Sequence, residues 1–360
     1  MYLKRHSVKN FRNISEIEFF PDRTVSVISG ENGQGKTNLL ESVYLLSGGR
    51  GFRSGKDRDF IKIGEDSGLI KSDFFALERN QNIEISITES GRQASLNGGV
   101  TERATLLAGR FCCVLFSPEH LMLVKGSPEQ RRRFIDMALC QIFPKYISEI
   151  HKYTRLVKQK NTLLKDCQRI SAAYDMLEVF DIQIAEAAKT VTDRRIWFAE
   201  NIAPVSSLEY EGISGNREIL SLKYSSTIWT EKTDFEEGLF ELERMREQDI
   251  KTGVCNIGPH RDDLDITLDG NESRVFASQG QQRSIVLSLK LAEASLIEKS
   301  LNDQPILLLD DLLSELDENR QNYLIKRLFG FQAIITGCDG GAIAKKTGAA
   351  VFDIKNGALV

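Results

Sequence analysis

The sequence lacks several features that would point to a membrane, a metal or a secreted protein. No apolar run approaches the roughly 20 residues of a membrane-spanning helix. The six cysteines form no CxxC pair, and together with the four histidines they show no metal-ligand spacing. The polar, alternating start MYLKRHSVKNF is not a signal peptide. We therefore expect a cytoplasmic protein with reduced thiols and no membrane partner.

An excess of positive charge is also absent, because the formal net charge is −4 over 360 residues. Any nucleic-acid binding must then come from local basic patches. Apolar residues make up 41% of the chain, which is ordinary for a globular protein and excludes general disorder.

The distribution of glycine and of apolar residues divides the chain into three parts. Residues 1–126 are rich in strand-like segments, with one helix beginning near Asn38. Residues 127–204 begin with a long stretch without glycine, and apolar residues recur there every three or four positions, which predicts two antiparallel helical arms, the first broken or kinked at Pro144. Residues 205–360 return to mixed structure and then alternate strand and helix, with LDITLDGNESRVFA as a hairpin. The fold class predicted is α/β, with a helical lobe inserted into a split nucleotide-binding domain.

The stretch GENGQGKT fits the phosphate-loop pattern G-x-x-x-x-G-K-[ST] between a strand and a helix. Glycines let backbone N–H groups surround phosphates, and the following helix adds its positive end. Lys36 would neutralise the β- and γ-phosphates of ATP, and Thr37 would bind Mg²⁺. The predicted nucleotide-binding residues of this loop are Gly30, Glu31, Asn32, Gly33, Gln34, Gly35, Lys36, Thr37 and Asn38.

The apolar run PILLLDD predicts a buried strand with two carboxylates at its carboxyl end. A phosphate loop needs such a carboxylate on a neighbouring strand to hold its metal. Asp310 is the predicted Mg²⁺ partner, and Asp311 is predicted to orient or deprotonate the attacking water.

The segment SQGQQR, just before a long helix, resembles the signature loop of ABC-type ATPases. In that class a serine, a glycine and a helix N-terminus bind the γ-phosphate of another subunit's nucleotide. The resemblance assigns this role to Ser278, Gln279, Gly280 and Gln281, and it implies a homodimer that forms on ATP binding. The segment at Ser314–Asp317 resembles the D-loop at the dimer seam.

Further motifs narrow the resemblance to the RecF family of SMC-like ATPase heads. These are NFRN, GENGQGKTNLLE, FSPEHL, GSPEQRRRFID, GPHRDDL, SQGQQR and LLLDDLLSELD, which together cover nearly the whole chain. The resemblance implies an ABC-type head with an antiparallel β subdomain and a short helical lobe. It also implies slow ATP hydrolysis, binding of double-stranded DNA, and action with RecR and RecO to load RecA at single-strand gaps.

The chain departs from the wider ABC pattern at two positions. The carboxylate after the Walker B aspartate is Asp311 where transporters and SMC proteins carry glutamate. The switch histidine is missing, and Thr336 or Gly337 occupies its region. Glu119 or His120 would take the place of the Q-loop glutamine.

Three basic clusters are candidates for phosphate contacts with DNA. The favoured cluster lies in the glycine-rich loop after the first helix and consists of Arg50, Arg53, Lys56 and Arg58. The others are Arg131–Arg133 at the start of the lobe, and Lys152, Arg155, Lys158 and Lys160 along its first arm. Arg132 or Arg133 could instead pair with Asp136 one helical turn on.

Three other functions are less consistent with the residues. A transporter motor would carry a Ser-Gly-Gly signature and a switch histidine. A relic nucleotide site would have lost Lys36 or Asp310, and both are present. A nuclease partner with a zinc hook would carry CxxC at the tip of the arm.

Overall fold

The computed structural model describes residues 1–49, 51, 56–101, 104–167, 172–230 and 232–360. These residues separate into two compact units. The first comprises residues 1–121, 208–217 and 279–360, and the second comprises residues 122–207 and 218–278. The second unit holds most of the predicted lobe and also residues 218–278, which the sequence assigned to the head. No helix in the described ranges is both long and apolar enough to cross a membrane.

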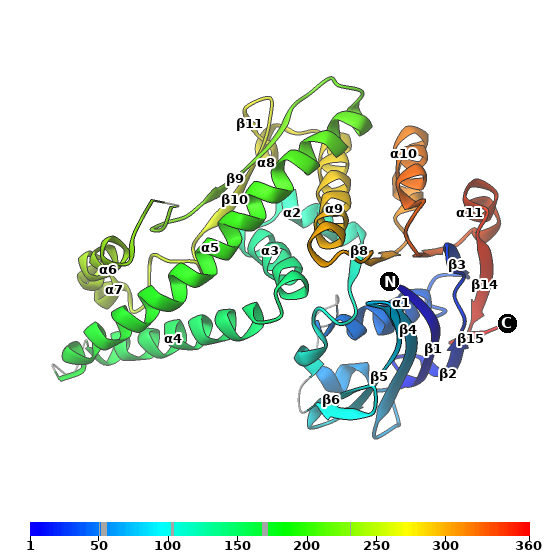
Figure 1. The fold of residues 1–360 in the computed structure, drawn as a ribbon, viewed down its shortest axis with the longest axis horizontal. Helices are drawn as coiled ribbons and strands as arrows, with labels where there is room; N and C mark the ends of the chain where they lie inside the picture. Colours follow the sequence, from blue (N-terminus) through cyan, green and yellow to red (C-terminus); the bar gives the residue numbers. More distant parts are fainter. Residues whose placement is uncertain (50, 52–55, 102–103, 168–171, 231) are drawn as a thin grey trace. The chain divides into compact units, whose positions relative to one another are not determined.

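A largely parallel sheet forms the centre of the first unit, with the strand order β15-β14-β3-β13-β12-β8 (Figure 1). Its strands are β3 (Val25–Ser29), β8 (Cys113–Phe116), β12 (Ile306–Leu309), β13 (Ala333–Gly337), β14 (Ala350–Lys355) and β15 (Ala358–Leu359). Every residue of β3, β8, β12 and β13 is buried, as expected for parallel strands covered on both faces.

The order of these strands corrects one expectation. The Asp310 strand was predicted to neighbour the phosphate-loop strand, but β13 lies between β12 and β3. Parallel pairing aligns Leu309 with Ile335 and Thr336 with Ile28. The three carboxyl ends therefore meet at one edge of the sheet, and the end of β13 separates the other two.

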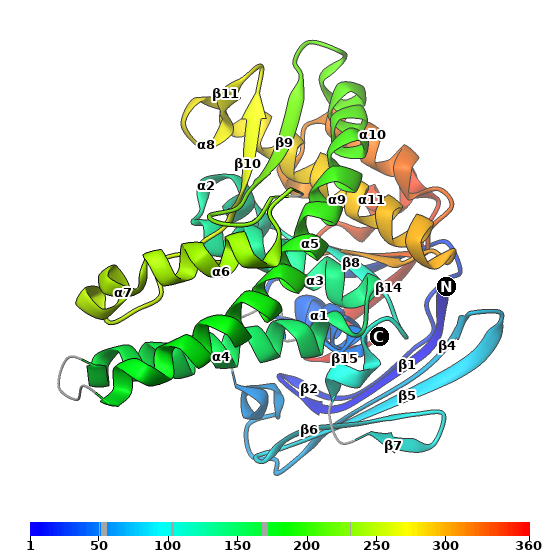
Figure 2. The ribbon, with the colours of Figure 1, turned by 60° about the vertical axis from the view of Figure 1, so that its left-hand side comes forward.

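A second sheet in the first unit is antiparallel, with the order β2-β1-β4-β5-β6-β7. Its strands are β1 (Tyr2–Phe11), β2 (Ile14–Phe19), β4 (Gly68–Ala76), β5 (Arg79–Thr88), β6 (Gly91–Leu96) and β7 (Gly99–Thr101). Burial alternates along β4 and β5, as expected for a sheet with one face on the core. The long curved strands β1, β4 and β5 are seen clearly in Figure 2. The α/β fold with an antiparallel subdomain is confirmed.

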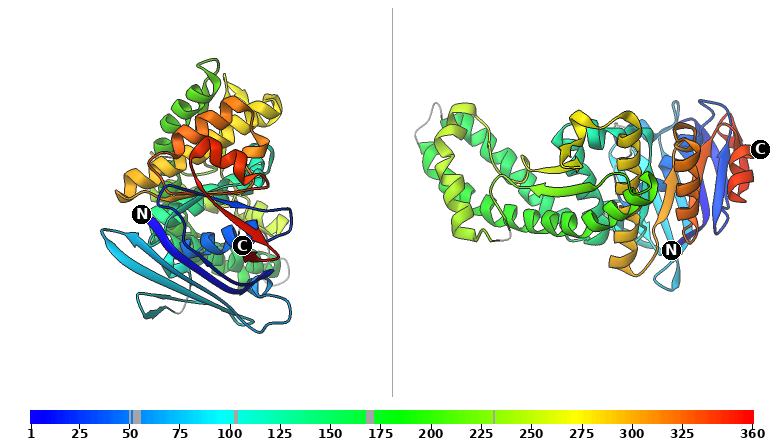
Figure 3. Two further views of the ribbon diagram at one scale, coloured as in Figure 1. Left: turned by 90° about the vertical axis from the view of Figure 1, so that its right-hand side faces the viewer. Right: turned by 90° about the horizontal axis from the view of Figure 1, so that it is seen from above.

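Helices and short 3₁₀ turns complete the first unit. The helices are α1 (Lys36–Tyr44), α9 (Gln279–Leu301), α10 (Glu318–Leu328) and α11 (Gly340–Thr347), and the 3₁₀ turns are η1 (Leu45–Ser47), η2 (Asp57–Phe60), η3 (Ala104–Leu107), η4 (Pro118–Leu121) and η5 (Leu313–Glu315). Helix α9 is buried on most of its circumference, because it packs on β8 and on η4. Both chain termini lie in this unit (Figure 3).

The second unit is mainly helical. It contains α2 (Met122–Lys125), α3 (Pro128–Ile142), α4 (Tyr146–Cys167), most of α5 (Ala172–Ser214), α6 (Phe235–Arg244), α7 (Arg246–Thr252), α8 (Ser273–Phe276) and the sheet β9 (Leu220–Ser225), β10 (Asp263–Leu268) and β11 (Asn271–Glu272). Helices α4 and α5 approach each other at one end and diverge towards the other, and α3 ends just before Pro144, so the predicted break is confirmed (Figure 1).

Two predictions about this region are wrong in detail. Helix α5 continues to Ser214 with Pro204 inside it, although mixed structure was expected from residue 205. The second strand of the predicted hairpin has only two residues, and α8 follows it directly.

The predicted pairing of Arg132 or Arg133 with Asp136 is also wrong. Asp136 instead accepts two hydrogen bonds of 2.9 Å from Arg195 on α5 and one of 2.6 Å from Tyr146. Burial lowers the pKa of Arg195, but Asp136, Tyr146 and Tyr224 together raise it, so its net shift is upward. Asp136 therefore pairs with an arginine of another helix, Arg195, and not with an arginine one turn away on its own helix.

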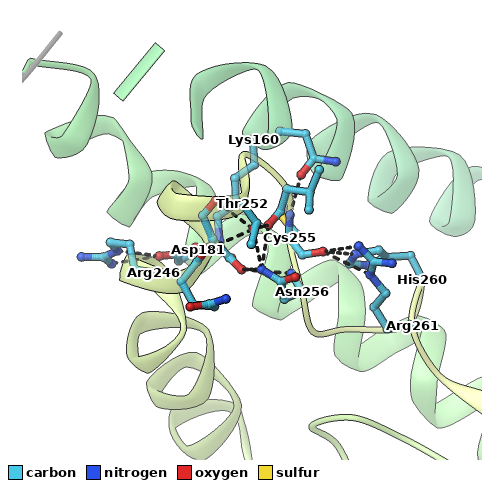
Figure 4. Close-up of polar contacts among 12 residues, drawn as sticks. Lys160, Asp181, Arg246, Thr252, Cys255, Asn256, His260 and Arg261 are labelled. Atoms are coloured by element: carbon cyan, nitrogen blue, oxygen red, sulfur yellow. Dashed lines mark hydrogen bonds and ion pairs between the residues drawn. The ribbon is translucent and has the colours of Figure 1, made fainter. Parts of the chain in front are cut away.

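Lys160 was grouped with the basic DNA candidates, but its side chain is fully buried. Its Nζ lies 2.7 Å from Asp181 on α5 and 3.2 Å from Asp249 on α7. Arg246 contacts the other oxygen of Asp181 at 2.9 Å, and Asn256 donates two hydrogen bonds to Asp249 (Figure 4). Two cations thus balance two carboxylates, and the cluster ties α4, α5 and α7 together. Lys160 is unavailable to DNA phosphates.

Removing this cation should destabilise the second unit. Lys160→Met should lower the free energy of unfolding by about 3–5 kcal/mol, because two buried carboxylates lose the charge they share. Lys158→Met is the matched control, because Lys158 is exposed on the same helix, and it should change stability by less than about 0.5 kcal/mol. Urea unfolding followed by circular dichroism measures both. Equal effects would contradict a stabilising role for Lys160.

Candidate functional site

The glycine-rich loop Gly30–Gly35 connects the buried strand β3 to α1. Gly30 has φ 156°, and a Cβ there would lie 2.5 Å from the Ile354 carbonyl oxygen on β14. Gly35 has φ 115° directly before the helix. Both positions favour glycine, because side chains are disfavoured at such backbone angles and Gly30 has no room for one. The loop therefore begins close to the sheet and ends on a helix N-terminus.

Lys36 is the first residue of α1, and its side chain is buried inside the loop. Its Nζ donates hydrogen bonds of 2.7 Å to the Gly30 carbonyl and 3.0 Å to the Glu31 carbonyl. The sulfur of Cys338, just after β13, lies 3.7 Å from the same nitrogen. A fixed cation within a ring of glycine backbone is the arrangement that holds the phosphates of a nucleotide.

Asn13, from the NFRN motif, supports the loop in a way the sequence reasoning missed. Its Nδ2 donates a 3.1 Å hydrogen bond to the Gly33 carbonyl, and its Oδ1 accepts one of 2.8 Å from Asn38. The Gln34 carbonyl accepts from the N–H of Gly357 at 2.9 Å. These hydrogen bonds hold the loop at both sides of its tip. The NFRN motif was the feature of the sequence that could have identified Asn13 as a residue that supports the loop.

Thr37, Asp310 and Thr336 meet at the edge of the parallel sheet. The hydroxyl of Thr37 donates to Asp310 Oδ1 at 2.8 Å, and the hydroxyl of Thr336 donates to the same oxygen at 2.9 Å. Asp310 is buried and follows β12 directly. The structure thus brings together the two side chains predicted to hold a metal.

The donor set at this point fits Mg²⁺. Thr37 and Asp310 offer one hydroxyl and one carboxylate, and Mg²⁺ is usually held by one or two carboxylates with waters and substrate phosphates. Over the described part of the chain, no group of three or more His, Cys, Asp or Glu side chains could hold a metal ion. Phosphate oxygens of the nucleotide and waters would therefore supply the remaining ligands of Mg²⁺.

Asp311 lies beside this pair in a strained backbone conformation. Its φ is 51°, and its N–H donates a 2.9 Å hydrogen bond to Thr336 Oγ1. Thr336 thus contacts both carboxylate residues from the place where the switch histidine was missing. Asp311 lines a cavity of about 470 Å³ with Asn32, Ser314 and Cys338. Asp311 therefore lines the same cavity as Asn32 of the phosphate loop.

The predicted signature residues lie at the start of α9. Gln279, Gly280 and Gln281 form its first turn, and Ser278 precedes them at the surface. The positive end of the helix is therefore located at these residues. Further along α9, Arg283 pairs with Glu315 of the predicted D-loop at 3.4 Å, and Ser284 accepts a 2.8 Å hydrogen bond from Arg320. Arg320, which sequence reasoning missed, holds α10 against the signature turn.

The two Q-loop candidates follow β8, the strand that pairs with β12. The N–H of Asp310 donates a 2.8 Å hydrogen bond to the Phe116 carbonyl, so this segment starts at the same sheet edge. Within it, His120 Nδ1 accepts from the N–H of Ser117 at 3.1 Å, while Glu119 is exposed. His120 is held by its own turn, and Glu119 has the freer side chain.

Half of the favoured DNA cluster can be placed. Lys56 and Arg58 are exposed at η2, where Arg58 lies 3.8 Å from Asp59. Arg50 and Arg53 lie outside the described residues. Of the Arg131–Arg133 cluster, Arg131 is buried, Arg132 is half-buried and Arg133 is exposed. The arm retains Lys152, Arg155 and Lys158 at its surface.

Comparisons with known proteins show the family of this chain. A family model described as RecF/RecN/SMC N terminal domain matches residues 2–352. The DNA replication and repair protein RecF of Agathobacter rectalis is 39% identical over 341 residues, 94% of this chain and 92% of the relative.

Two solved structures cover nearly the whole chain. One is described as the recombination mediator protein RecF with ATPrS in the RecFOR pathway, with a TM-score of 0.93, 32% identity, and coverage of 99% of this chain and 97% of that one. The other is the same mediator with ATP, with a TM-score of 0.91, 31% identity, and coverage of 100% and 97%.

Proposed function

This chain belongs to the RecF family of SMC-type ATPase heads, and on that premise we propose that it is an ATP-driven switch of recombinational DNA repair. The observation that carries the proposal is the hydrogen bond to Asp310 from Thr37, which directly follows the buried Lys36 in the chain. A hydroxyl, a carboxylate and a fixed cation at the end of a glycine loop are what a nucleotide triphosphate with Mg²⁺ requires. The solved relatives with ATP and ATPrS support this choice of ligand.

The residues of the site have separate roles in this proposal. The loop N–H groups and Lys36 hold the phosphates, while Thr37 and Asp310 hold Mg²⁺, which when bound offsets charge on the phosphate oxygens. Thr336 keeps the Asp310 carboxylate turned towards Thr37. Asp311 orients the attacking water and accepts its proton. Its carboxylate is one methylene shorter than a glutamate, which suits slow hydrolysis.

The role of Asp311 can be separated from binding. Asp311→Asn should keep ATP affinity and slow hydrolysis by about 10²-fold or more, because the amide cannot accept the proton. Asparagine also tolerates the left-handed backbone that Asp311 adopts. Single-turnover hydrolysis beside equilibrium binding of a fluorescent ATP analogue measures the two effects. Hydrolysis at the parent rate would show that Asp311 is not the base.

We infer that a complete site needs two copies of the chain. The glycine loop covers one side of a triphosphate, and the α9 N-terminus with Ser278 is a second anion site, suited to the γ-phosphate of a partner's nucleotide. A two-fold dimer brings each loop to the other copy's signature. ATP then stabilises the dimer, and removal of the γ-phosphate takes away the interaction that distinguishes the closed state.

A mixture of two inactive variants tests this function. Lys36→Met disables the loop, and Ser278→Arg blocks the signature with bulk and charge. Their heterodimer holds one intact site, with Lys36 from the Ser278→Arg chain and Ser278 from the Lys36→Met chain. ATP-dependent capture of one tagged chain by the other should appear only in the mixture. If the mixture stays monomeric with ATP, the shared site is refuted.

The same dimer would present two copies of the basic loop to double-stranded DNA. No base-reading motif is present, so contacts with phosphates and weak dependence on sequence are expected. Within the RecFOR pathway, the ATP-bound dimer would act with RecR and RecO at single-strand gaps to promote RecA loading. ATP hydrolysis would then release the DNA.

Salt dependence locates the DNA surface. Replacing Arg50, Arg53 and Lys56 together with Ala should weaken duplex binding and flatten the log–log salt slope by about 0.9 for each DNA phosphate that the chain no longer neutralises. ATP binding by the monomer should be unchanged. Fluorescence anisotropy at several salt concentrations gives the slope. An unchanged slope would move the interface to Lys152, Arg155 and Lys158 on α4.

A further inference from the structure

Arg131, the first arginine of GSPEQRRRFID, joins three segments of the second unit. Its Nε and NH2 atoms each lie 2.7 Å from one oxygen of Asp263 at the start of β10. Its NH1 atom donates to the carbonyls of Leu123 and Gly126, at 3.3 and 3.0 Å, at the end of α2. The side chain itself belongs to α3 and is buried. One guanidinium therefore holds α2, α3 and β10 in a fixed arrangement.

The partner segment is held equally firmly from its other side. Asp262 is fully buried, and its carboxylate accepts hydrogen bonds from Tyr224 at 2.8 Å and from the N–H and hydroxyl of Thr227 at 2.7 and 2.8 Å. Its carbonyl accepts a 2.6 Å bond from Arg132. The start of β10 cannot shift without breaking several of these bonds, so Arg131 fixes α2 to a rigid strand.

The short helix α8 packs on two of the segments that Arg131 joins. It contacts both α2 and β10, and Ser273 at its start is fully buried. Its last residue is Phe276, so only Ala277 separates α8 from Ser278. Within this unit, Ser278 is therefore joined to the block formed by α2, α3 and β10 through α8 and Ala277.

We propose that Arg131 is a positioning residue for Ser278, acting through Asp263 and the α2–α8 packing. The proposal rests on the shared site described above, because only a signature that binds a partner's nucleotide needs its position fixed this closely. Misplacement of a binding group by about 1 Å can cost as much as 10²-fold. Lysine cannot replace this arginine, because an ammonium lacks the planar fork that matches a carboxylate at two atoms.

The two-variant mixture offers an internal control for this role. In the heterodimer, only the Lys36→Met chain uses its signature, and only the Ser278→Arg chain uses its glycine loop. Arg131→Lys is added to one chain or to the other, and ATP-dependent capture is measured without DNA. Arg133→Lys is the matched control, because Arg133 is exposed two residues away on the same helix.

Arg131→Lys in the Lys36→Met chain should lower capture by about tenfold, the size expected when one charged hydrogen bond is removed. In the Ser278→Arg chain it should change capture by less than about twofold, and Arg133→Lys should have no effect in either chain. ATP affinity of the monomer should stay at the parent value. A general folding defect would lower capture from either chain and so would lack this asymmetry.

Other outcomes overturn the assignment. An equal decrease from both chains would make Arg131 a structural residue only, and no decrease from either would remove it from positioning. If Arg131→Lys yields no soluble chain, the isosteric Asp263→Asn variant is placed in one chain or the other instead. Capture should then again decrease only when the change is in the Lys36→Met chain. If the Lys36→Met and Ser278→Arg chains show no capture even without Arg131→Lys, the shared site is refuted. That result is distinct from a result that refutes only the role of Arg131.

Discussion

The hydrogen bond from Thr37 to Asp310 is the interaction on which the rest of the site depends. It links the start of α1 to the end of β12 across the intervening strand β13. Thr336, at the end of β13, donates to the same carboxylate oxygen and accepts from the N–H of Asp311. The start of α1 and the ends of β12 and β13 are thus joined at two hydroxyl groups. The phosphate loop, the metal ligand and the proposed base take their places from this junction.

The two units contribute in different ways. The first contains the glycine loop, both strand-end carboxylates and the D-loop, which is the chemistry of the proposed switch. The second contains buried charge networks around Arg131, Arg195 and Lys160, each balanced by aspartates from other elements. Such networks stabilise one arrangement of helices and penalise others when a partner is displaced. They suit the role proposed for this unit, which is to hold Ser278 in one position.

Local patterns in the sequence were sufficient for the fold class and for much of the site. The run ILLL predicted a two-faced buried strand ending in carboxylates, and β12 ends directly before Asp310. GENGQGKT predicted a loop between strand and helix, which is what the chain forms. The strand order could not be predicted, because β3, β12 and β13 are all short, apolar and fully buried. Nothing local says which of them lies between the other two.

The partners of charged side chains could not be predicted when they lay far apart in the sequence. Asp136 was predicted to pair with an arginine on its own helix, but Arg195 on α5 donates two hydrogen bonds to it. Lys160 looked like one of a row of surface cations, yet it faces Asp181 and Asp249 from two other helices. Helical periodicity gives the faces of a helix but not the charge that tertiary packing brings to them.

We propose that one chain provides only part of the groups that surround its triphosphate. The most direct measurement is the mass of the full-length chain by sedimentation equilibrium, with Mg²⁺ and a slowly hydrolysed ATP analogue, across a range of protein concentrations. We expect the mass of one chain without nucleotide and the mass of two chains with it. A chain that is saturated with the analogue and yet keeps the mass of one copy at every concentration would contradict it.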